Sequence, residues 1–151
     1  MGKGKTEKNN KKNDLPNAKK MKQLAKKVVD TMMKEDAFSK WLGIEVLEIS
    51  TGTAKLKMTV RDEMTNGFNI AHGGIAYSLA DSALAFAANS YGIQSLSIET
   101  SISHTKKVES GDVLIATTKE VTKNNICLVM KLLRKLVPSI DFTTICQYNV
   151  M

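Results

Sequence analysis

The side chains best suited to chemistry gather in residues 66–92, which read NGFNIAHGGIAYSLADSALAFAANSYG. This stretch contains Asn66, the run His72-Gly73-Gly74 and one carboxylate, Asp81, the only side chain charged at neutral pH between residues 75 and 88. Apolar residues recur at helical spacing around it, which predicts a largely buried helix. These residues are Ala76, Leu79, Ala80, Ala83, Leu84, Ala87 and Ala88. A carboxylate there is costly to desolvate unless it is paired or used, so Asp81 is the first catalytic candidate. The plainer alternative is an aspartate at the solvated edge of the helix.

The two glycines fall where this helix should begin. Backbone N–H groups at a helix N-terminus lack an intrahelical partner, and the helix dipole favours negative charge there. Glycine allows a substrate carbonyl to approach this backbone closely. The free N–H groups can then stabilise the negative charge that a carbonyl oxygen gains when it becomes an oxyanion. Asp81 follows Gly73 by eight residues, or about 12 Å along a helix, so one carbonyl cannot touch both. Either the two residues do unrelated jobs, or different subunits supply them to one site.

The pattern Asn66-x5-His72-Gly73-Gly74-x6-Asp81, with Asn89-Ser90 at the far end of the helix, resembles hotdog-fold acyl-CoA thioesterases. The group it resembles most is the phenylacetic-acid-degradation (PaaI-like) type, which includes small four-subunit acyl-CoA thioesterases. The resemblance covers roughly residues 40–150. It implies a homodimer or homotetramer whose active site lies at an interface between two antiparallel central helices.

The resemblance also implies roles for the individual residues. Asp81 would act either as general base on water or as the nucleophile that forms an acyl-enzyme anhydride, and the sequence does not choose between them. Gly73 would bind the oxyanion through its N–H, and Asn66 would orient the water or contact the thioester. His72 would bond across the interface. Without the resemblance, Asn66 before Gly67 is simply a turn residue, a lone histidine such as His72 is more often structural than catalytic, and Gly73 is equally well a plain helix-start glycine.

Two further residues are expected to bind substrate. Gly74 supplies a second backbone amide at the helix start, and Ser97 aligns with a serine that some relatives carry near the catalytic carboxylate. The chain departs from the family at residues 103–107, which read SHTKK, where relatives commonly have an aromatic or apolar residue followed by Arg-Pro or Ser-Pro. Lys106 and Lys107 could meet coenzyme A phosphates or form a solvated turn, and His104 is assigned no role.

The surrounding periodicities predict the elements that position these residues. Residues 18–42 read as an amphipathic helix with a second short turn through Phe38 and Trp41. Strands are expected at 44–49, 54–60, 94–104, 112–121, 125–136 and 139–149, with turn formers between them. This order argues for an α+β protein of the hotdog type, an antiparallel sheet curled around one long helix, with an extra N-terminal helix. The expected organisation is a disordered basic tail over 1–17, a helical segment over 18–42 and the hotdog domain over 43–151.

Composition narrows the class of protein. A chain of 151 residues with 42% hydrophobic residues suits one soluble globular domain. No apolar run is long enough for a membrane span, and we expect the two cysteines to be buried free thiols of a cytoplasmic protein. With two histidines and no Cys/His cluster of metal-site spacing, neither a metal nor another cofactor is expected, and coenzyme A enters as part of the substrate.

The net charge of +7 belongs to the N-terminal part of the chain. Residues 1–27 hold ten lysines against Glu7 and Asp14, a local balance of +8, so the remainder is slightly acidic. A specific nucleic-acid surface is therefore not expected. A protein that bound nucleic acid through its tail would lose that binding, and its steep salt dependence, without residues 1–17.

The sequence thus predicts an acyl-CoA thioesterase that hydrolyses its substrate to free acid and coenzyme A. The main alternative is a non-catalytic module of the same fold that binds acyl-CoA or an acyl carrier, since fold does not fix function. Asp81 favours the enzyme because a binder has no need of a carboxylate in an apolar helix. A hotdog dehydratase is a weaker alternative, because only His72 is well placed for it.

Overall fold

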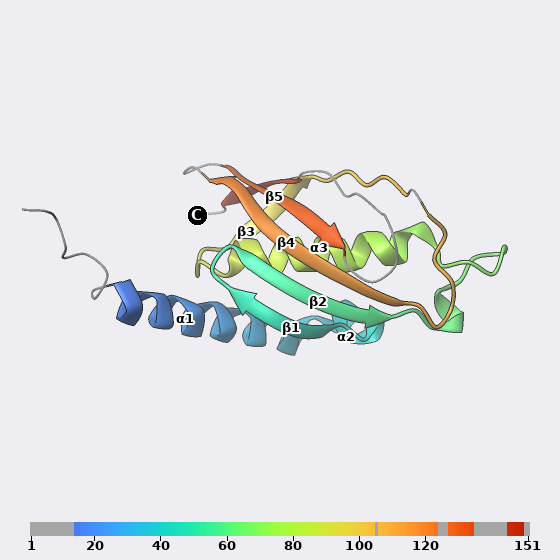
Figure 1. Ribbon diagram of the computed structural model, residues 1–151, viewed down its shortest axis with the longest axis horizontal. Coiled ribbons are helices and arrows are strands. Elements are labelled where there is room, and N and C mark those ends of the chain that lie inside the picture. Colours follow the sequence, from blue (N-terminus) through green and yellow to red (C-terminus); the bar gives the residue numbers. More distant parts are fainter. Residues whose placement is uncertain (1–13, 105, 124–126, 135–144, 150–151) are drawn as a thin grey trace, which may run out of the picture.

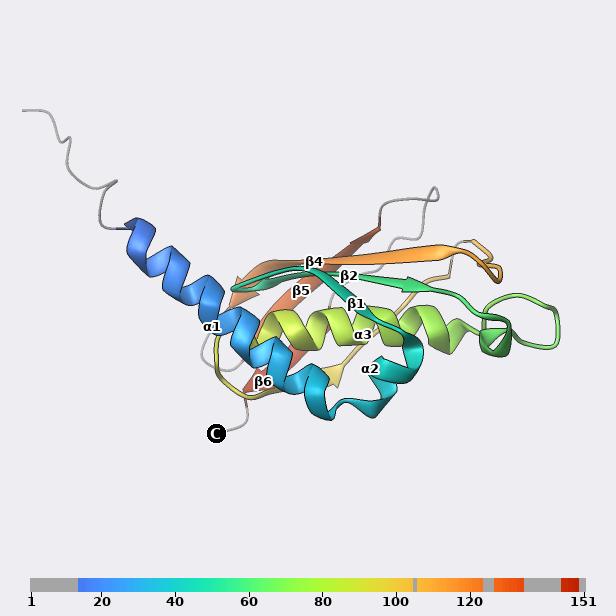
Figure 2. The same cartoon turned by 90° about the horizontal axis from the view of Figure 1, so that it is seen from below.

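A helix of 17 residues, α3 (Gly73–Asn89), lies against one face of a six-stranded sheet (Figures 1 and 2). The computed structural model describes residues 14–104, 106–123, 127–134 and 145–149. The other elements are α1 (Asp14–Glu35), α2 (Ala37–Leu42), β1 (Glu45–Ser50), β2 (Thr53–Thr59), the 3-10 turn η1 (Asp62–Met64), β3 (Ser95–Glu99), β4 (Val113–Lys123), β5 (Cys127–Arg134) and β6 (Ile145–Asn149). Figure 2 shows the sheet on one side of α3 and the helices α1 and α2 on another. None of the described helices is long and apolar enough to cross a membrane.

The strand order is β1-β2-β4-β5-β6-β3, and every neighbouring pair is antiparallel. β3 follows α3 directly in the chain but pairs with β6, so the chain crosses to the far edge of the sheet before β4 returns to β2. Among the described strands β1 and β3 therefore form the two edges. An edge strand leaves a row of backbone N–H and C=O groups without strand partners.

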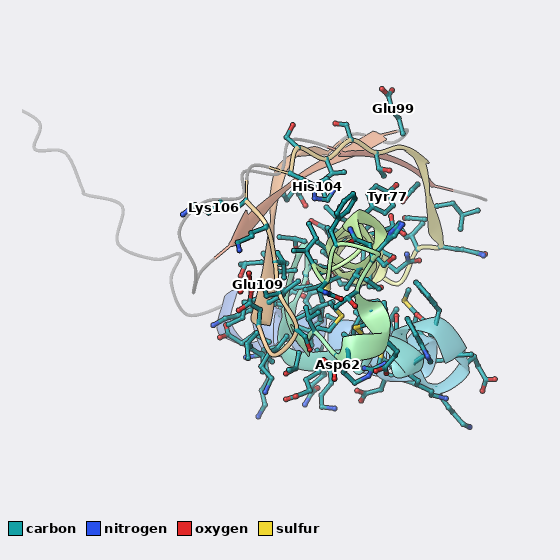
Figure 3. The ribbon with its side chains drawn as sticks, turned by 90° about the vertical axis from the view of Figure 1, so that its right-hand side faces the viewer. Asp62, Tyr77, Glu99, His104, Lys106 and Glu109 are labelled. Atoms are coloured by element: carbon teal, nitrogen blue, oxygen red, sulfur yellow. The ribbon has the colours of Figure 1, made fainter. Side chains whose placement is uncertain are left out.

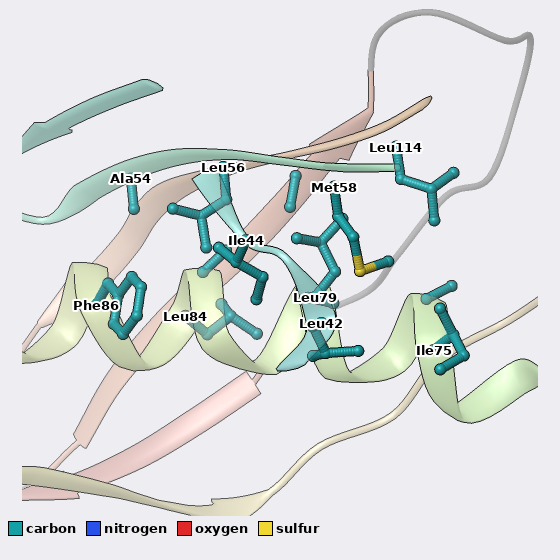
Figure 4. Close-up of a cluster of buried hydrophobic side chains, with 14 of the residues drawn as sticks. Leu42, Ile44, Ala54, Leu56, Met58, Ile75, Leu79, Leu84, Phe86 and Leu114 are labelled. Atoms are coloured by element: carbon teal, nitrogen blue, oxygen red, sulfur yellow. The ribbon is translucent and has the colours of Figure 1, made fainter. Parts of the chain in front are cut away.

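The core forms where α3 meets β2 and β4 (Figure 4). Leu56 and Met58 point from β2 toward α3, which contributes Leu84 and Phe86 to the core, and all four side chains are at most 1% exposed. Burying each contributes about 1.5–3 kcal/mol. The alternation predicted for β2 and the helical spacing predicted for α3 are both confirmed, and together they fix which face of α3 turns away from the sheet.

The N-terminal helical segment is broken into two helices at Asp36. The Asp36 side chain caps α2: Oδ1 accepts from the backbone N–H of Ser39 at 2.8 Å, and Oδ2 accepts from its hydroxyl at 2.6 Å. The short second turn through Phe38 and Trp41 is confirmed as α2, which ends at Leu42 and is capped by Gly43 with φ +72°.

The helix begins earlier than the sequence predicts, at Asp14 rather than at residue 18. Residues 14–17, assigned to the tail, are helical because a proline is tolerated in a first turn and an acidic residue suits a helix start. The predicted disordered tail otherwise falls on residues 1–13, outside the described residues. The expected burial of the two cysteines also concerns side chains that are not described.

The strand predicted over 94–104 ends at Glu99. The pairing register with β6 shifts between Ser97 and Glu99. The next residue, Thr100, shares a hydrogen bond between its Oγ1 and the hydroxyl of Tyr77 on α3. Residues 100–104 therefore follow the helix instead of the sheet. The strand predicted over 139–149 is observed as β6 from Ile145, and residues 139–144 lie outside the described part of the chain.

The turn between β1 and β2 rests on the C-terminal end of α3. Gly52 has φ +72°, and its N–H donates to Ser90 Oγ at 2.8 Å. A Cβ at this position would stand 2.8 Å from both Glu120 Oε2 and the Tyr91 hydroxyl, which donates to Glu120. Burial, followed by the Glu120 carboxylate, raises the pKa of Tyr91 to about 12, so Tyr91 stays protonated as this donor.

Gly52→Ala should therefore lower the free energy of unfolding by about 1–2 kcal/mol, the usual cost of a left-handed L-residue. Denaturant unfolding of wild type and Gly52→Ala at the same protein concentration measures this decrease in the free energy of unfolding. The matched control is Gly67→Ala, because a Cβ there meets no atom within 4 Å. Equal stability of the two variants would contradict the prediction.

Candidate active site

The start of α3 leaves one backbone donor unused. His72 caps the helix, and its Nδ1 accepts from the N–H of Gly74 at 3.1 Å. The N–H of Ala71 donates to Val108 O, that of His72 to Met64 O, and that of Ile75 to His72 O. Within the part of the chain that is described, the N–H of Gly73 makes no hydrogen bond. It is thus the one amide of residues 71–75 left to bind an oxygen at the positive end of the helix.

Gly74 and His72, the two neighbours of Gly73, are hydrogen-bonded to each other in the cap of the helix. The amide of Gly74, predicted to bind substrate, is taken by His72. Because Nδ1 of His72 is an acceptor here, the neutral ring carries its proton on Nε2 and can donate from that side. The His72 side chain is exposed, so this donor is accessible at the surface of the chain.

Asn66 shapes the loop that leads to the helix. Its Oδ1 accepts from the N–H of Phe68 at 2.9 Å, and its backbone N–H donates to Ile70 O at 2.8 Å. The loop also contains Asn69 at φ +57°, a conformation that asparagine tolerates. The carbonyl half of the Asn66 amide therefore serves as a turn acceptor, and its NH2 group bonds to no other described residue.

Asp81 lies two turns beyond Gly73 and is half-buried. The hydroxyl of Ser97, on β3, donates to Asp81 Oδ1 at 3.3 Å, so the structure places these two predicted residues together. None of the ion pairs among the described residues includes Asp81. Burial raises the pKa of Asp81, although the hydrogen bond from Ser97 lowers it. The carboxylate is thus more basic than an ordinary aspartate.

A polar seam, formed by three residues of α3 and three residues of the chain from β3 onward, runs from the start of α3 to its middle. Gly73, Tyr77 and Asp81 are spaced by four residues and share one face of the helix. They are met in reverse order by His104, Thr100 and Ser97. His104 Nε2 stands 3.2 Å from the Cβ position of Gly73, Thr100 is bonded to the Tyr77 hydroxyl, and Ser97 is bonded to Asp81. Figure 3 shows Tyr77 and His104 on one side of α3.

The seam separates Gly73 from Asp81 within one chain. Eight helical residues span about 12 Å, and the Tyr77 side chain stands between the two positions on the same face. A carbonyl bound by the N–H of Gly73 is therefore beyond the reach of Asp81 in the same subunit. No group of three His, Cys, Asp or Glu side chains that could hold a metal ion occurs among the described residues.

Comparison with known proteins identifies the family of this chain. Residues 68–131 match the family model described as the thioesterase superfamily. A protein of Archaeoglobus fulgidus that carries an esterase name is 42% identical over 106 residues, which span 70% of this chain and 69% of that protein. The acyl-coenzyme A thioesterase PaaI of Escherichia coli is 39% identical over 88 residues, 58% of this chain and 63% of the relative. The chain belongs to the thioesterase superfamily.

The fold of this thioesterase is the predicted hotdog fold. The solved structure of Escherichia coli PaaI superposes with a TM-score of 0.81 and 27% sequence identity, covering 87% of this chain and 96% of that one. The resemblance to the PaaI type of hotdog thioesterase is therefore confirmed, and with it the α+β class and the central helix.

Three residues of the thioesterase seam were not identified from the sequence: Tyr77, Thr100 and His104. The spacing of Tyr77, midway between Gly73 and Asp81, could have indicated it, because residues four apart share a helix face. Thr100 and His104 gave no such signal, since they lie on a segment that appeared to be strand.

The raised pKa of Asp81 makes a prediction for pH dependence. If the charged carboxylate is required, kcat/KM of this thioesterase should fall as the pH drops through a pKa above the ordinary aspartate range. Ser97→Ala removes a hydrogen bond that stabilises the charged form, so it should move this acid limb to higher pH. A pH–rate profile of both proteins measures the shift. An acid limb that moves to lower pH in Ser97→Ala would contradict the assignment.

Proposed function

We propose that this thioesterase hydrolyses acyl-CoA thioesters to the free acid and coenzyme A, at a site that combines Gly73 of one subunit with Asp81 of another. The unused N–H of Gly73, flanked by amides that are all satisfied, is the observation that carries the proposal. It offers a donor where the thioester oxygen gains negative charge. The acyl-CoA class is suggested by the name of the Escherichia coli relative.

The proposed chemistry needs only water and the residues of the site. In one route the Asp81 carboxylate takes a proton from water as the hydroxide attacks the thioester carbon, the C–S bond breaks, and the thiolate of coenzyme A leaves and is protonated. In the other, a carboxylate oxygen of Asp81 attacks, coenzyme A leaves, and water hydrolyses the resulting anhydride. The higher basicity of a half-buried carboxylate supports either route.

The exposed surface around the seam supports a site shared between subunits. β3 is an edge strand, and it carries Leu96, which is 54% exposed, on the side away from Asp81. Phe68, on the loop that leads into α3, is 86% exposed. Large apolar side chains at an open sheet edge and beside a site are typical of surfaces that another chain covers. A homodimer, or a homotetramer built from such dimers, would cover them and bring a second Asp81 toward Gly73.

The test is steady-state hydrolysis of a panel of aryl- and fatty-acyl-CoA thioesters, followed by release of free thiol. We expect turnover of at least one member, unchanged by EDTA because the proposed reaction uses no metal. A matched panel of oxygen esters of the same acids controls for general esterase activity. A protein that binds these thioesters but cleaves none would favour the non-catalytic binding module instead.

A further inference from the structure

His104 is the side chain nearest to the position where a Cβ would stand on Gly73. Its Nε2 is 3.2 Å from that position, Cε1 is 3.5 Å and Cδ2 is 3.8 Å from it, so the ring points its Nε2 edge toward Gly73. Cα–Cβ bonds in a helix tilt toward its N-terminus. The Nε2 edge of the ring therefore lies on the side from which an oxygen would approach the N-terminus of α3.

The distances allow one oxygen to contact both groups. By standard covalent geometry the amide nitrogen of Gly73 lies about 2.5 Å from its Cβ position. With the 3.2 Å to Nε2, the two nitrogens are at most about 5.7 Å apart, close to the combined length of two N–H···O hydrogen bonds. An oxygen between them therefore lies within hydrogen-bonding distance of both the Gly73 amide and the His104 ring.

The placement of His104 follows from the rest of the seam. The bond between Tyr77 and Thr100 ties the segment after β3 to α3 one turn beyond Gly73, and four residues later that segment reaches the helix start. The ring nitrogens of His104 bond to no other described side chain. The neighbouring His72 has already committed its Nδ1 to the helix cap, so it does not duplicate the position.

We propose that His104 is a second hydrogen-bond donor to the thioester oxygen, acting through Nε2–H beside the N–H of Gly73. This inference rests on the proposed thioesterase function and adds a residue to the oxyanion site. Gly73 and His104 come from the same subunit, whereas Asp81 comes from the other. Tyr77 and Thr100 are positioning residues that hold the ring over Gly73.

Two substitutions separate hydrogen bonding from bulk. His104→Phe keeps a ring without the donor and should lower kcat by about 10- to 100-fold with little change in KM, because an oxyanion donor acts mainly in the transition state. His104→Gln keeps an N–H donor and should retain most of that activity. Ser103→Ala, on the same exposed segment, is the control and should behave as wild type. Thermal unfolding and size-exclusion chromatography check that all variants fold and assemble alike.

A spectroscopic measurement separates this inference from the proposed function. Isotope-edited infrared spectra of phenylacetyl-CoA labelled with 13C at the thioester carbonyl are recorded on Asp81→Asn, with and without His104→Phe. Relative to the substrate free in solution, we expect the carbonyl stretch to move to lower frequency when the substrate is bound to Asp81→Asn. The shift should be smaller when it is bound to the protein that also carries His104→Phe. An equal shift in both, or a His104→Phe protein that hydrolyses thioesters as fast as wild type, overturns the role of His104 and leaves the proposed function standing. A rise in KM alone would make His104 a wall of the substrate pocket and also overturn the donor role. A wild type that neither cleaves nor binds the thioesters overturns both proposals.

Discussion

Asp81→Asn is expected to lower kcat for thioester hydrolysis by about two orders of magnitude or more. Asparagine has nearly the same shape, so it keeps the packing of α3 and can still accept from Ser97, but it has no charged oxygen to take a proton or to attack. Both routes open to Asp81 therefore fail in the variant. The assay is thiol release under saturating substrate, compared with wild type.

The matched control is Asp30→Asn, which removes a carboxylate from the exposed face of α1, where Asp30 pairs with Lys26 at 2.7 Å. This variant should keep wild-type kcat, because surface ion pairs are worth little and Asp30 does not belong to the seam. Asp81→Asn with an unchanged kcat would remove Asp81 from the chemistry, whatever its burial. Trapping of an acylated Asp81 in wild type would distinguish the nucleophile from the base.

The parts of this protein that the sequence predicts are those governed by local periodicity. The helical spacing around Asp81 and the two-residue alternation of β2 each follow from one buried face, so α3 and β2 appear where expected. The two glycines of the run His72-Gly73-Gly74 lie at the start of α3 as predicted, whereas the capping of that helix by His72 is seen only in the structure. Ser97 was placed beside Asp81 through family resemblance rather than through periodicity.

The parts that the sequence does not predict depend on contacts between distant segments. β3 ends at Glu99, directly before the bond between Thr100 and Tyr77, and no pattern within residues 94–104 reveals this contact with α3. The contact of His104 with Gly73 depends on that same crossing. Likewise the position of β3 at the sheet edge, beside β6, is a pairing between strands far apart in the chain. Such contacts arise from the packed fold and not from local propensity.

The same seam explains why an apolar helix tolerates a carboxylate. Asp81 is half-buried with one hydroxyl donor and no cation among the described residues, which raises its pKa and costs stability at neutral pH. A purely structural helix would gain from an apolar residue there. Strained or poorly satisfied groups of this kind are what functional sites retain, so the cost itself argues for catalysis.

Two inactive variants should regain activity when they are produced together in one cell. Gly73→Val is expected to block the oxyanion position, because even its Cβ stands 3.2 Å from His104 Nε2 and its methyl groups fill the approach to the amide. Asp81→Asn lacks the carboxylate. In a mixed dimer, one site receives both defects, while the other combines the intact Gly73 of one chain with the intact Asp81 of its partner.

Random pairing makes half of the dimers mixed, and each mixed dimer has one working site of two, so co-expression should restore about one quarter of wild-type activity. Each variant expressed alone should stay near background, and mixing the two purified proteins without subunit exchange is the control. If both groups acted within one chain, every chain in the mixture would carry a defect and no activity would return. Recovery of activity is therefore expected because Gly73 and Asp81 of one chain lie about 12 Å apart along α3, too far for both to act on one carbonyl. The second group must then come from another subunit.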